Sequence, residues 1–96
     1  APDREVYLNN LAILLALHRN DTSDRPLALI NRAIARRGPE PFFLDTRAVV
    51  HTAAGRYDDA VRDLEVAASL ADKPVYQFHL AVAHDKADRP AARDVA

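Results

Sequence analysis

The feature that most constrains the fold is the stretch of residues 41–74, which has the pattern of two amphipathic helices joined by a tight turn. Its first half ends at Gly55, a residue that tolerates the positive φ of a helix stop. Its second half begins with Asp58 and Asp59, where acids favour the positive end of the helix dipole. One apolar stripe follows, made of Ala60, Val61, Leu64, Ala67 and Ala68. Neither helix can bury its stripe alone, so the stretch predicts a helical pair packed against further helices.

The regions on either side of this stretch are imperfect copies of it. Four apolar positions of the second predicted helix recur at an offset of 34 residues, so that Leu27, Ile30, Ala33 and Ile34 correspond to Val61, Leu64, Ala67 and Ala68. In the first helix of each copy an aromatic residue and an alanine recur in one frame, as Tyr7 with Ala12, Phe43 with Ala48 and Tyr76 with Ala81. The offsets there are 36 and 33 residues, which places the differences between copies in loops.

This arrangement resembles the tetratricopeptide repeat, a helix-turn-helix unit of about 34 residues. The residues that carry the resemblance are Ala48, Gly55, Tyr57, Ala60, Leu64 and Ala67, followed by Pro74. The resemblance implies an all-α fold, an α-solenoid of about three helix-turn-helix repeats with the third incomplete, in a single domain of residues 1–96. Repeat one would span residues 5–38, repeat two residues 41–73 and repeat three residues 74–96.

Capping and turn residues mark where the predicted helices begin and end. Asp3 is expected to cap a first helix over residues 5–19. Pro26 suits the first turn of a second helix, where its missing N–H costs nothing. A fifth helix is predicted over residues 75–87, and residues 89–96 have the signals of the start of a sixth.

Composition excludes several classes of function. A formal net charge of −1 offers no clustered cations for nucleic acid, and the absence of cysteine removes thiol catalysis and thiolate metal sites. The longest apolar run, residues 11–17, is too short to span a bilayer, so no membrane partner is expected. The chain contains no methionine, so we expect a piece of a longer protein with any targeting segment outside it, and a cytoplasmic location is favoured over others.

Four histidines raise the question of a metal or catalytic site. His51 and His84 occupy the same place in successive copies, and Asp85 adjoins the second. We favour a packing role for His51, because a metal site needs at least three convergent ligands and an orienting shell around them. Neither a glycine-rich phosphate loop nor a serine in a glycine elbow is present. We therefore predict no cofactor, no metal and no enzymatic activity.

Arg47 stands in a helix position where the family usually has a large apolar residue. One interpretation is a partly buried arginine whose stem packs and whose guanidinium pairs with an acid such as Asp63 or with a backbone carbonyl. The alternative is an anchor that faces a ligand. We favour the buried pair.

The resemblance also implies a concave groove, lined by the second, fifth, ninth and twelfth positions of the first helix of each repeat. These positions hold Val6, Asn9, Ile13 and Ala16, then Phe42, Asp45, Val49 and Thr52, then Val75, Phe78, Val82 and Asp85. The residues assigned to peptide binding are Asn9, Ile13, Phe42, Asp45, Val49, Thr52, Phe78, Val82 and Asp85. Family members that clamp a C-terminal carboxylate use lysine, arginine and asparagine there, and only Asn9 qualifies. An apolar groove instead suits an amphipathic helix or an extended hydrophobic segment.

The function implied by the resemblance is a non-catalytic scaffold that binds a protein or peptide. Another part of the same parent protein is an equally acceptable occupant, because an exposed apolar groove is sticky. The alternative is a terminal structural segment of a longer solenoid that supports a neighbouring domain or self-associates. The sequences around Asn10 and Thr46 look most like bacterial members of the family.

Overall fold

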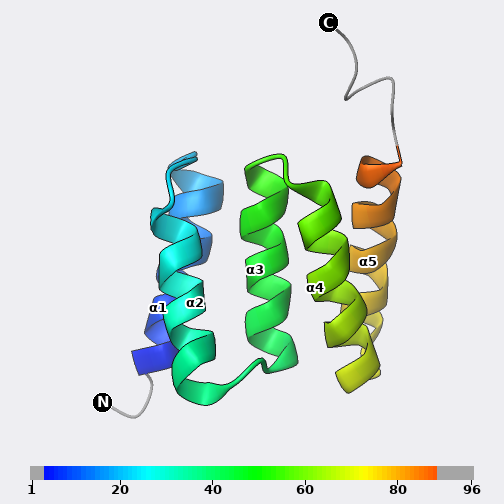
Figure 1. The fold of residues 1–96 in the computed structure, drawn as a ribbon, viewed down its shortest axis with the longest axis horizontal. Helices are drawn as coiled ribbons and strands as arrows, with labels where there is room; N and C mark the ends of the chain where they lie inside the picture. The colour runs from blue at the N-terminus through cyan, green and yellow to red at the C-terminus, as the bar shows by residue number, and fades with distance from the viewer. Residues whose placement is uncertain (1–3, 89–96) are drawn as a thin grey trace, which may run out of the picture.

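The computed structural model describes residues 4–88, and these residues form helices and no strand (Figure 1). The elements are α1 (Arg4–Ile13), the π-helical segment η1 (Leu14–His18), α2 (Arg25–Arg37), α3 (Pro41–Ala53), α4 (Tyr57–Leu70) and α5 (Pro74–Ala87). The predicted all-α class is therefore confirmed for this part of the chain. The expected cap at Asp3 and the expected helix over residues 89–96 lie outside the described residues. None of the described helices has the length and apolar character needed to cross a membrane.

Prolines and glycines set the helix boundaries. A proline stands in the first turn of α2, α3 and α5, where its fixed φ suits a helix start and its missing N–H leaves no bond unmade. Gly38 follows α2 with φ 96° and Gly55 follows α3 with φ 81°. Both values lie in the left-handed region that a side chain disfavours, so both glycines end their helices, and Gly55 does so as predicted.

The first helix differs from the sequence-based expectation in its last turn. Residues 5–19 were expected to form one regular α-helix, whereas residues 14–18 widen into the π-helix η1. The N–H of Arg19 donates to the carbonyl of Leu14 at 3.2 Å, which is the i to i+5 pattern of this geometry. A π turn holds one more residue than an α turn, so η1 takes up an extra residue before the loop to α2.

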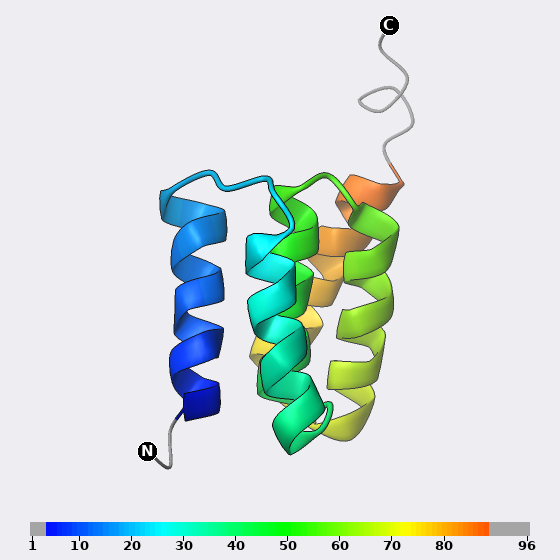
Figure 2. The same ribbon diagram turned by 60° about the vertical axis from the view of Figure 1, so that its left-hand side comes forward.

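Consecutive helices run antiparallel and lie side by side in chain order (Figures 1 and 2). α3 stands between α2 and α4, and it also contacts α1 and α5. Its apolar residues enter three separate buried clusters. The first joins Phe43 and Val50 to α1 and α2, the second joins Ala48 to α4 and α5, and the third joins Leu44 to Ala67 and Tyr76. α3 is therefore the central helix of the fold.

Two of the aligned positions differ in burial from their counterparts. Tyr7 is 65% exposed, although Phe43 and Tyr76 are buried. Phe43 packs against α1 and α2, and Tyr76 packs against α3 and α4, but no described helix precedes α1 to cover Tyr7. Likewise Ala12 and Ala48 are buried by the helix that follows theirs, whereas Ala81 is exposed because no described helix follows α5.

Candidate functional site

A groove of about 420 Å³ lies between α3 and α5. Its walls carry Val49 from α3 with Phe78 and Val82 from α5, and three buried residues also line it, namely Ala48, Leu64 and Ala83. The volume falls in the range of about 300 to 1,000 Å³ that is usual for ligand pockets, and most of the lining side chains are apolar. The groove can therefore accept apolar side chains of a partner.

A close polar contact between His79 and Asp45 joins α5 to α3 within the groove lining. The Nδ1 atom of His79 lies 2.7 Å from Oδ1 of Asp45, and the two residues are 34 apart in the chain. The Asp45 side chain is 19% exposed and that of His79 36% exposed, so the pair meets both the groove and solvent. Because this carboxylate already has a partner inside the protein, a ligand in the groove need not supply a cation to it.

Lys86 lies near the other end of the groove. It belongs to the last turn of α5, where a cation favours the negative end of the helix dipole. Its Nζ lies 5.9 Å from the centre of the Tyr57 ring, within the range of a cation–π contact. The ring holds the long lysine side chain over the first turn of α4 and keeps its charge at the mouth of the groove.

Five of the nine residues assigned to peptide binding line this groove, namely Asp45, Val49, Thr52, Phe78 and Val82. The other four do not. Ile13 is half-buried in α1, Asp85 lies exposed on α5, and Phe42 is half-exposed at the start of α3 with its ring 5.8 Å from that of Phe43. The predicted binding residues that line the groove thus come from two helices, α3 and α5, and none comes from α1.

The structure corrects the role expected of Asn9. Its side chain is fully buried beside Leu8 and Ala12, so it cannot donate a hydrogen bond to a partner in a groove. Its Nδ2 donates to Oδ1 of Asn10 at 3.3 Å, and its own Oδ1 has no hydrogen-bond partner among the described residues. The reason is helical geometry, since residues 8, 9 and 12 share the face that packs on α2 and α3.

The site predicted from the sequence lacks seven further lining residues, namely Leu17, Ala48, Ala53, Leu64, His79, Ala83 and Lys86. One signal was available for Lys86, because it follows Phe78 and Val82 at successive intervals of four residues and so continues their stripe. No comparable signal existed for Leu17, which comes from η1 and reaches the groove only through the packing of η1 on α3.

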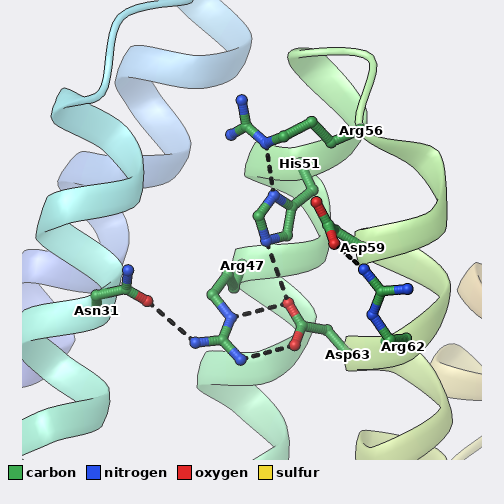
Figure 3. Close-up of polar contacts among 7 residues, drawn as sticks. All are labelled: Asn31, Arg47, His51, Arg56, Asp59, Arg62 and Asp63. Atoms are coloured by element: carbon green, nitrogen blue, oxygen red, sulfur yellow. Dashed lines mark hydrogen bonds and ion pairs between the residues drawn. The ribbon is translucent and has the colours of Figure 1, made fainter.

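A cluster of polar side chains lies on another side of α3 (Figure 3). Arg47 donates from Nε and Nη2 to the two oxygens of Asp63 at 2.9 and 2.8 Å, and from Nη1 to Oδ1 of Asn31 at 3.0 Å. This bidentate hydrogen bonding raises the pKa of Arg47. The predicted pairing of Arg47 with Asp63 is confirmed, and the arginine links α3 to both α2 and α4.

His51 completes this cluster. Its Nδ1 accepts a hydrogen bond of 2.9 Å from Nε of Arg56, and its Nε2 lies 3.7 Å from Oδ2 of Asp63. Burial lowers the pKa of His51, and the negative charge of Asp63 opposes this by favouring the protonated ring. His84, expected at the equivalent position, is exposed on α5. Within residues 4–88 no three ligand-type side chains gather in a way that could hold a metal ion.

Comparison with known proteins identifies no relative: no family model, no curated protein and no solved structure matches the chain. The two features that the geometry offers are therefore the apolar groove and the buried polar cluster. The groove is open to a partner, whereas the acid of the cluster is enclosed and already bound within the chain. The groove is accordingly the candidate site for recognition.

Proposed function

We propose that the chain is a tetratricopeptide-like repeat module without catalytic activity, and that it binds an amphipathic helix of another polypeptide in the groove between α3 and α5. The observation that carries this proposal is the groove itself. It combines an apolar lining with five residues that the family resemblance assigns to binding.

Equivalent residues pack in the same way in successive helix pairs, which supports the repeat interpretation. Ala12 packs against Ile30 and Ala33 of the next helix, and Ala48 packs against Ala60 and Leu64. Small residues at these positions let the paired helices approach closely. Neighbouring copies that cover each other's apolar faces are the basis of stability in repeat proteins.

Exposed apolar side chains support a polypeptide ligand. Phe78 is 66% exposed and Val82 38% exposed, and both lie on the α5 wall. The stretch from Phe78 to Lys86 rises about 12 Å along the helix at about 1.5 Å per residue, which matches about two turns of a partner helix. A partner with apolar residues at positions i, i+3 or i+4, and i+7 would place that face in the groove.

The charged residues at the two ends of the groove favour one orientation of the bound helix. Asp45 is paired with His79 at one end, and the ammonium of Lys86 lies at the other. An acidic residue one turn beyond the partner's apolar stripe would complement Lys86. An exposed pair of this kind contributes only about 0.2 to 1 kcal/mol, so it would orient the ligand rather than dominate its affinity.

The proposal is tested by selection from a phage-displayed library of amphipathic helical peptides on the full chain. Peptides so obtained are then measured by fluorescence anisotropy against a double variant, Val49→Glu with Phe78→Glu, which puts two carboxylates into the apolar lining. The matched control is Val66→Glu, because Val66 is 46% exposed on α4 and does not line the groove.

We expect the selected peptides to bind the wild type and the Val66→Glu control with the same affinity. They should not bind the double variant. Circular dichroism should show the same helix content in all three proteins. A selection that yields no binder, or binders that keep their affinity for a folded double variant, would overturn the groove as a binding site.

The alternative function, self-association, is favoured by a second exposed apolar stripe. Tyr7 of α1 and Leu14 of η1 are seven residues apart on one side of the first helix, and they are 65% and 47% exposed. A second copy of the chain would cover this stripe. Sedimentation equilibrium at rising concentration tests it, because association that is lost in Tyr7→Glu with Leu14→Glu would support the alternative and a strict monomer would exclude it.

A further inference from the structure

Two hydrogen bonds between His51 and Arg56 link the end of α3 to the start of α4. The main-chain N–H of Arg56 donates to the carbonyl of His51 at 2.8 Å, and the side-chain Nε of Arg56 donates to Nδ1 of His51 at 2.9 Å. Arg56 is also the residue that caps α4, since its carbonyl accepts the N–H of Ala60 at 3.1 Å. Figure 3 shows the arginine reaching back over the imidazole.

The direction of the side-chain hydrogen bond fixes the protonation state of His51. A guanidinium only donates hydrogen bonds and does not lose its proton in proteins, so Nδ1 of His51 must carry a lone pair. The ring is then neutral, with its hydrogen on Nε2, the atom that faces Asp63. A second proton can be added only at Nδ1. There it would replace the accepted hydrogen bond by two donors that face each other.

The charges around the ring do not offset this loss. Arg47 of α3 and Arg56 of the turn face His51, as do Asp59 and Asp63 of α4. Both oxygens of Asp63 already accept hydrogen bonds from Arg47, and Asp59 is paired with Arg62. An imidazolium would therefore compete with Arg47 for Asp63 and with Arg62 for Asp59, in a position where only 11% of the side chain reaches solvent. Burial is also the main cause of the lowered pKa of His51.

We infer that His51 and Arg56 form an acid-sensitive latch on the turn between α3 and α4. Proton uptake at Nδ1 releases the Arg56 side chain, and the turn over residues 54–56 opens while α2 keeps its packing. The device is local, because the contacts that it breaks lie at the end of one helix and the start of the next. It does not depend on the groove having a ligand.

Amide hydrogen exchange, followed by NMR on the full chain between pH 7.5 and pH 5.5, tests the latch. After correction for intrinsic exchange, we expect protection at Ala54 and Arg56 to fall by up to about tenfold per pH unit once His51 begins to take up its proton. At every pH the amides of Ile30 and Ala33 in α2 should remain more protected than those of the turn, because the turn opens locally at a lower free energy. Equal protection in the turn and in α2 throughout would mean that both exchange only by global unfolding and would overturn the latch.

Two variants isolate the histidine. His51→Gln keeps an acceptor for Arg56 and a donor for Asp63 but does not titrate, so its turn should exchange independently of pH after the same correction. His18→Gln removes an exposed histidine and should behave as the wild type. Persistence of the pH effect in a folded His51→Gln protein would refute the assignment.

A measurement on the unmodified protein keeps the inference testable if the variant does not fold. Nitrogen-15 chemical shifts of the imidazole distinguish the two neutral tautomers. We expect the hydrogen of His51 on Nε2 at pH 7.5, and a shift to the doubly protonated ring that coincides with the loss of protection at Arg56. A hydrogen found on Nδ1 at pH 7.5 would contradict the hydrogen bond on which the latch depends.

Discussion

The two sides of α3 that face the groove and the polar cluster use their residues in opposite ways. On the groove side, Val49 and Thr52 are partly exposed to solvent and line the groove. On the cluster side, Arg47 and His51 are bound to partners from the turn, from α2 and from α4. The difference indicates that one side of the helix is available for recognition while the other holds the helices together. Substitutions on the two sides should therefore separate binding from stability.

The largest expected effect is on the cluster side. Asp63→Ala leaves Arg47 and His51 without their shared acid in a largely buried place, which costs about 3 kcal/mol by analogy with other broken buried pairs. Urea denaturation measures this free energy. The double variant Arg47→Leu with Asp63→Leu removes both charges and should lie much closer to the wild type. Equal losses in the two proteins would show that packing, rather than charge, explains the effect.

A smaller effect concerns the dependence of global stability on pH. The pKa of His51 is lowered in the folded chain, so below the ordinary histidine value of about 6.5 the unfolded state binds more protons than the folded state. The free energy of unfolding should therefore fall as the pH drops below about 6.5, by at most about 1.4 kcal/mol per unit, with no contribution from His51 above that value. Urea titrations at several pH values measure it. His51→Gln should remove this dependence of the free energy of unfolding on pH. His84→Gln should retain it, because His84 is exposed on α5.

Phe78→Ala sharpens the comparison from the groove side. The side chain is 66% exposed, so the free energy of unfolding should change by less than about 0.5 kcal/mol. Affinity for a helical peptide selected on the wild type should nevertheless fall at least about tenfold, as is common for an aromatic anchor. Fluorescence anisotropy and urea denaturation on the same preparation separate the two. A large loss of stability would show that the groove wall belongs to the core.

The smallest effect is expected at an exposed ion pair on α4. Arg62→Ala removes the ion pair with Asp59. The Arg62 side chain is 68% exposed and that of Asp59 39% exposed, so the free energy of unfolding should fall by less than about 0.5 kcal/mol. The same urea assay measures it. Together with Asp63→Ala, it tests whether burial decides the importance of an ion pair in this chain. A cost similar to that of Asp63→Ala would contradict that rule.

Much of the fold was predictable because it depends on local chemistry. Gly55, Pro26 and Pro74 act on the backbone wherever they occur, so the helix boundaries followed from the sequence. Arg47 with Asp63 was also predictable, since a cation within an apolar stripe must find an acid on a neighbouring helix. Five groove residues of α3 and α5, namely Asp45, Val49, Thr52, Phe78 and Val82, followed from the positions that the resemblance implies.

Other features depend on contacts that a single stripe of residues does not encode. Whether Asn9 faces a groove or the core is decided by where α2 and α3 press on α1, and the same packing brings Leu17 to the groove. The π-helical turn η1 contains no glycine or proline, so the sequence carries no local signal that predicts it. The contact of Arg56 with His51 needs a side chain to fold back across a turn, which spacing alone does not predict.

The three clusters that meet on α3 also determine how the chain would respond to a mechanical load. α3 shares apolar contacts with every other helix, whereas α1 and α5 each have one side bare of described neighbours. Tension applied between the two ends of residues 4–88 would first peel these outer helices, while α3 would be the last to lose its neighbours. The molecule is in this sense strongest at its middle and yields from its edges inward.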